Sequence, residues 1–187
     1  MLRTALLLPY LLLGAQLTAQ LNDDRRSFTP ADSLRGSIGP ERAWWDVRHY
    51  AVFVTPDLDQ RTIKGRTYIK FTATKPGRRM QIDLQRPLEV DSIHMWVERP
   101  FQVGDGRFEG GTSVKTAVPF EREGDVIWLD LPVGSRIGGS PGQYDPGEGS
   151  TLWIDYHGKP KAAKNPPWDG GWVWRKDAQG NPWVSVA

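Results

Sequence analysis

The sequence has 187 residues, with 24 lysines and arginines against 22 aspartates and glutamates. This near balance, without a long block of either sign, argues against a surface for nucleic acid or an anionic membrane. The lack of cysteine excludes a disulfide framework, so stability has to come from a hydrophobic core. Nine tryptophans, 20 glycines and 15 prolines favour a β-rich chain with many turns.

The amino terminus has the features of a secretory signal peptide. Met1 and Arg3 precede a short apolar stretch, and the small residue Ala19 comes before a polar region. The apolar stretch is shorter than the ~20 residues that span a bilayer and contains Pro9, which favours cleavage over anchoring. We therefore expect residues 1–19 to be removed. The mature chain would be exported, to the periplasm or the extracellular space, with no membrane association after cleavage.

Residues 20–43 are polar and rich in glycine and proline, which predicts an extended arm before the folded domain. The nearest helix candidate, 31–39, contains Gly36 and Gly39 and would end after about one turn. The domain is then expected to cover residues 44–187 as a single unit.

Short stretches of alternating apolar and polar residues recur after position 44, with turn residues between them. This period of two is typical of β-strands with one face in a core. The Gly- and Pro-rich residues 134–149 indicate a surface loop. We predict an all-β domain, either an antiparallel saddle-shaped sheet or a sandwich, with strands at 46–55, 62–74, 80–84, 93–97, 126–131 and 151–157.

The last segment is predicted to be a β-hairpin. Trp172 and Trp174 alternate with Val173, residues 177–181 supply turn chemistry, and an apolar run resumes at Trp183. The second arm has no charge, cap or polar tail, which is unusual at the edge of a domain. We interpret the chain as the front piece of a longer protein, truncated at its carboxyl end.

Few residues carry recognisable chemistry. His49, His94 and His157 each lie alone on a predicted strand, without the spacing of a metal site, so a structural role is favoured for them. No Gly-x-Ser-x-Gly elbow occurs in the sequence. The sequence therefore indicates no catalytic residue and no metal ligand.

Four tryptophans near the end of the chain are the candidate site. They would form either an exposed platform that stacks on sugar rings or an apolar interface with a following domain. We favour the interface, at a cleft or between domains, because the hairpin lies next to the expected downstream chain. The four residues are Trp168, Trp172, Trp174 and Trp183.

Two segments resemble a known family. Tyr50–Phe71 followed by Met80–Leu84 resembles the opening of zinc aminopeptidases of the aminopeptidase N and leukotriene A hydrolase family, in which a strand leads through I-x-G to a second strand and then to x-I-D-L. The segments Ala163–Asp177 and Gly180–Trp183 are similar to exported bacterial members. The resemblance covers residues 42–187.

The resemblance implies an amino-terminal saddle-shaped β domain that packs on a downstream catalytic domain. There, a His-Glu-x-x-His helix would hold zinc and a Gly-x-Met-Glu-Asn loop would anchor the free amine of a peptide substrate. None of these motifs is in this sequence, so the chain itself is expected to be a non-catalytic scaffold for the peptidase and its cleft. A secreted glycan-binding β-sandwich is the alternative, and a structural or adhesive exported domain is a third possibility.

Overall fold

The computed structural model describes residues 29–102, 108–133 and 141–186. The predicted signal peptide, 1–19, and the first part of the predicted arm lie outside the described residues. The described residues are mostly β-strand, in antiparallel sheets that do not close, which confirms the predicted fold class.

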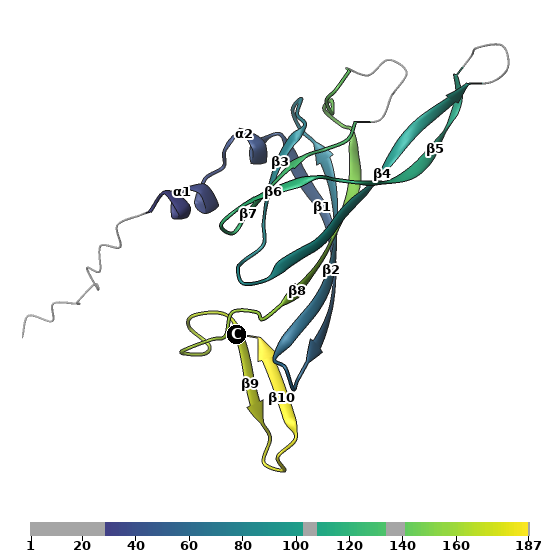
Figure 1. Cartoon of the computed structure of the whole chain (residues 1–187). Coiled ribbons are helices and arrows are strands. Elements are labelled where there is room, and N and C mark those ends of the chain that lie inside the picture. The colour runs from purple at the N-terminus through teal and green to yellow at the C-terminus, as the bar shows by residue number, and fades with distance from the viewer. Residues whose placement is uncertain (1–28, 103–107, 134–140, 187) are drawn as a thin grey trace, which may run out of the picture.

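Two sheets and a separate hairpin make up the fold (Figure 1). The larger sheet has the order β1 (Trp45–Asp57), β2 (Thr62–Ala73), β8 (Gly149–Gly158), β4 (Glu89–Gln102) and β5 (Phe108–Ala117). The smaller sheet has the order β3 (Arg79–Asp83), β7 (Val126–Asp130) and β6 (Phe120–Glu123). The hairpin consists of β9 (Trp172–Lys176) and β10 (Pro182–Val186) and projects beyond both sheets.

The core lies between the two sheets. Alternation along each strand sends one set of apolar side chains into this space, and burying them removes apolar area from water. The larger sheet contributes Phe71, Met95 and Leu152, which are fully buried, and the smaller sheet contributes Met80 and Leu129. Removing these side chains from water is what holds the two layers together.

The segment that was expected to be an extended arm differs in the structure. It contains the helices α1 (Pro30–Gly36) and α2 (Pro40–Ala43). Helix α1 begins with a capping box, in which Thr29 and Asp32 exchange side-chain and backbone hydrogen bonds. It ends at Gly36, close to where the sequence predicted. The helix candidate of the sequence analysis began at residue 31, one residue after the observed start, and the capping pair of Thr29 and Asp32 is the local signal that fixes this start.

Strand β1 contains a β-bulge between Val47 and His49. Plain alternation places Val47 on the same face as Phe53. The extra residue of the bulge instead puts Val47 on the face of Tyr50, toward the smaller sheet. Plain alternation along β1 therefore assigns the wrong face to Val47, which precedes the bulge.

The expected surface loop, 134–149, also needs a correction. Its described part places Tyr144 in the core at 3% exposure, with its ring against Trp44 and Phe71. The backbone of Tyr144 exchanges two hydrogen bonds with Gly77. The glycine is required here, because a Cβ at position 77 would lie 2.2 Å from the Trp44 ring. One aromatic side chain thus anchors a loop whose composition is otherwise that of a surface.

Candidate functional site

The turn of the terminal hairpin forms as the sequence predicted. The backbone N–H groups of Gln179 and Asn181 donate to Asp177 Oδ1, and Gly180 supplies a positive φ of 87°. Hydrogen bonds from the side chain and then the backbone of Asn181 lower the pKa of Asp177. These contacts set the register of the two strands, so they decide which side chains share a face.

Two of the four predicted tryptophans are brought together. The rings of Trp172 and Trp174 stack with centroids 5.4 Å apart and an interplanar angle of 18°. Both side chains are partly buried and pack against the core of the domain. Their paired residues on β10 are Val186 and Val184, which lie on the same face. This face of the hairpin is therefore partly covered by the chain itself.

The other two tryptophans are elsewhere. Trp183 is paired with Arg175, on the opposite face of the hairpin, and its side chain is 54% exposed. Trp168 lies in the turn before the hairpin and is 88% exposed. The four residues therefore do not all share one face of the hairpin. Their role at an interface stays a prediction.

Hydrogen bonds fix the segment that leads into the hairpin. The backbone N–H groups of Lys164 and Asn165 donate to Asp169 Oδ2, and the bond from Asn165 is the main cause that lowers the pKa of Asp169. Trp172 N donates to Lys161 O at 2.8 Å. The hairpin is thus tied to the preceding loop by backbone bonds as well as by its tryptophans.

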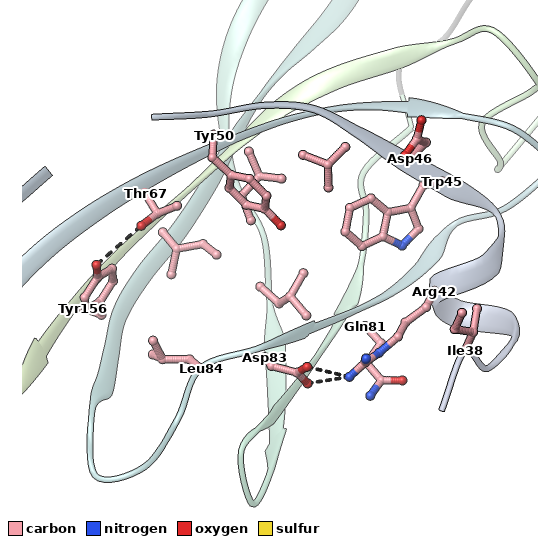
Figure 2. A pocket seen from close by; sticks show the side chains of 14 residues that line it. Ile38, Arg42, Trp45, Asp46, Tyr50, Thr67, Gln81, Asp83, Leu84 and Tyr156 are labelled. Carbon is pink, nitrogen blue, oxygen red and sulfur yellow. Dashed lines mark hydrogen bonds and ion pairs between the residues drawn. The ribbon is translucent and has the colours of Figure 1, made fainter. Parts of the chain in front are cut away.

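An apolar groove of about 450 Å³ opens between the two sheets, next to β1 and β3 (Figure 2). Each of these strands is the outer strand of its sheet, so no other strand of the described residues closes the gap. The guanidinium of Arg42 donates two hydrogen bonds to Asp83 at the rim, at 2.7 and 2.6 Å. The groove walls include Tyr50, Ile69, Ile82, Leu84, Ile154 and Tyr156.

The chemistry of the groove suits binding rather than catalysis. Burial and then the negative charge of Asp83 raise the pKa of Tyr50, so its phenol stays protonated at neutral pH. None of the described residues lining the groove forms a nucleophile and base pair. Sequence reasoning missed this groove because Arg42 and Asp83 are 41 positions apart, and the x-I-D-L motif that contains Asp83 does not indicate its partner.

The outer face of the larger sheet carries a row of aromatic rings. Phe53 contacts Tyr68, Tyr68 contacts Trp153, and Trp153 contacts Trp96, with ring centroids 6.1, 6.1 and 5.7 Å apart. Each ring comes from a neighbouring strand in the order of the sheet. The alternation of side chains along β2 and β8 places Tyr68 and Trp153 on the outer face, so the sequence pattern of these two strands indicates part of this row. The row explains why Trp153 is buried on an uncovered face.

A hydrogen-bond network lies beside this row. Arg66 pairs with Asp155, and Ser92 Oγ donates to the same carboxylate at 3.2 Å. The hydrogen bonds from Arg66 are the largest cause that lowers the pKa of Asp155. All three side chains have partners within the sheet, so the network is explained by cross-strand pairing.

The histidines do not assemble into a metal site. His94 stacks on Trp153 at 5.6 Å, and His157 Nδ1 lies 2.6 Å from a carboxylate oxygen of Asp91. His49 is on the outer strand β1. Within the described ranges, no group of three histidine, cysteine, aspartate or glutamate side chains could hold a metal ion. The residues present there do not fit a zinc centre.

The part of the chain that the structure describes also contains no helix long and apolar enough to cross a membrane.

Solved structures similar to this chain include a metallopeptidase and a hydrolase. The M1 zinc metallopeptidase from Deinococcus radiodurans is 20% identical over 70% of this chain and 24% of its own chain, with a TM-score of 0.46. Leukotriene A4 hydrolase from Saccharomyces cerevisiae is 13% identical over 77% of this chain and 19% of its own, with a TM-score of 0.44. The chain thus spans about a fifth to a quarter of the length of these structures.

These two proteins are of the kind that the sequence motifs resemble. No family model and no curated protein matches the sequence.

Proposed function

We propose that this chain is the non-catalytic, amino-terminal domain of an exported zinc aminopeptidase, and that it supports the catalytic domain and the substrate cleft. The motifs in Tyr50–Leu84 and Ala163–Trp183 support this reading. In this proposal the zinc ion and the site that binds peptide substrates belong to a downstream domain. Export is proposed from the features of residues 1–19.

The observation that carries the proposal is the hairpin β9–β10. A two-stranded hairpin on its own is marginally stable in water, because only a third strand or a packing partner buries enough apolar area. This hairpin is a separate two-stranded sheet, and its Trp183 is 54% exposed. An exposed tryptophan on such an element is typical of an interface core. We infer that a downstream domain covers the face that carries Trp183.

The test compares the full-length gene product with the 187-residue chain. Amide hydrogen exchange at β10 and acrylamide quenching of tryptophan fluorescence both report burial of the hairpin. We expect slower exchange and weaker quenching in the full-length protein. In the full-length protein, a Trp183→Ala variant should exchange its β10 amides as fast as the 187-residue chain does. Equal exchange at β10 in both proteins would show that nothing downstream covers the hairpin.

A further inference from the structure

Strand β1 has a free edge among the described residues. It is the outer strand of the larger sheet, and its one partner strand within 29–102, 108–133 and 141–186 is β2, along its length from Trp45 to Asp57. Every second residue of an outer strand directs its backbone N–H and C=O away from the sheet. The exposed side of β1 is therefore a row of hydrogen-bonding groups that another strand can complete.

Between His49 and Thr55 this edge lacks the features that normally prevent pairing. Natural outer strands are protected by charges, prolines, bulges or short length. From His49 to Thr55 the sequence His-Tyr-Ala-Val-Phe-Val-Thr has no charged carboxylate, lysine or arginine and no proline. Tyr50, Val52 and Phe53 are 53%, 58% and 62% exposed.

The opposite edge of the same sheet is different. Strand β5 contains the pair Gly110 and Gly111, and it places Lys115 among its exposed residues. A charge and two glycines make that strand a poor template for pairing. The sheet thus has one protected edge and one unprotected edge.

We propose that β1 pairs with β1 of a second copy of this chain, antiparallel and about a two-fold axis at Val52. This pairing is independent of the proposed peptidase function. It places Tyr50 opposite Val54, Ala51 opposite Phe53 and His49 opposite Thr55 of the second copy. An aromatic side chain opposite a β-branched one stabilises a sheet, and no charge faces a like charge. Two-fold symmetry requires such a self-complementary strand.

The features on either side of this stretch limit the pairing to it. Pro56 has no N–H to donate, and it follows the stretch directly. The bulge between Val47 and His49 breaks the ladder at the other end. Residues 49–55 are therefore the only part of β1 with a regular, uncharged edge. The two copies would share one continuous sheet.

The experiment is sedimentation of the full-length gene product with a matched pair of variants. Val54 on β1 and Val114 on β5 are both outer-strand valines at 37% exposure. Val54→Lys introduces a charge at the proposed contact, and Val114→Lys introduces the same charge at the opposite edge. We expect a dimer for the wild type and for Val114→Lys, and a monomer for Val54→Lys. Circular dichroism checks that both variants stay folded.

Two results would overturn the proposal. The first is a wild-type protein that sediments as a monomer up to the limit of its solubility, because then another segment or nothing occupies the edge. The second is a Val54→Lys variant that is folded and still dimeric, which would place the contact elsewhere.

Discussion

Gly65 on β2 lies directly beneath the ring of Tyr156 on β8, the residue paired with it in the sheet. A Cβ at position 65 would lie 2.2 Å from Cζ of that ring, well inside the contact distance of real atoms. Tyr156 is 8% exposed and forms part of the groove wall. Gly65→Ala should therefore displace the tyrosine and destabilise the domain.

The size of the effect follows from two opposing contributions. A buried tyrosine covers about 150–250 Å². If the displaced ring returns about 100 Å² of that area to water, the cost is ~2.5 kcal/mol at about 25 cal/mol per Å². Alanine in place of glycine in a strand regains roughly 0.5–1 kcal/mol of backbone entropy. We expect a net loss of about 2 kcal/mol in the free energy of unfolding, and a fall of roughly 4–8 °C in Tm.

Urea unfolding followed by tryptophan fluorescence measures this loss, and the chain offers a matched control. Gly111 on β5 is also in a strand of the larger sheet, but the atom nearest to a Cβ at this position would be Arg99 O, at 3.8 Å. Gly111→Ala should therefore be neutral or slightly stabilising. In a Tyr156→Ala background, Gly65→Ala should cost almost nothing, because the clashing ring is gone. A stable Gly65→Ala protein, or an equal loss in both backgrounds, would refute the reasoning.

Two further predictions concern the hairpin. The pKa of Asp177 is lowered, so its hydrogen bonds stabilise the folded state above the unfolded pKa of about 3.9 and are lost as pH falls through the lower folded value. Asp177→Asn should reduce the loss of Tm between pH 5 and pH 2, and an unchanged acid profile would contradict this. Trp174→Ala should cost about 2 kcal/mol, roughly half the value for a fully buried tryptophan, because Trp174 is partly buried against Trp172 and the core. In the 187-residue chain, Trp183→Ala should change the free energy of unfolding by no more than about 0.5 kcal/mol, as for other exposed residues. Equal losses for Trp174→Ala and Trp183→Ala in urea unfolding would contradict the assigned faces.

The regular strands could be predicted from the sequence because their alternation is local. In β8, Leu152, Ile154 and Tyr156 face the core as expected, and the hairpin formed with the predicted turn. Strand β5 had no such signal, since its Gly110, Gly111 and Ser113 resemble a loop. Its place in the sheet depends on pairing with β4, which is a tertiary contact.

The candidate site was predictable in part. The alternation of Trp172 and Trp174 correctly indicated two rings on one face, but the face of Trp183 depended on the register across the turn. Tyr144 and the pair of Arg42 with Asp83 could not be predicted, because their partners are far apart in the sequence. Side chains that meet only through the topology leave no periodic signal.

The most direct test of the account is a combined zinc and activity measurement on the full-length gene product. We expect bound zinc, hydrolysis of peptides with a free amino terminus, and little hydrolysis of the same peptides with a blocked amino terminus. Removal of the metal by a chelator should abolish the activity, and zinc should restore it. A folded full-length protein that binds no zinc and cleaves no peptide would contradict the assignment of this chain to an aminopeptidase.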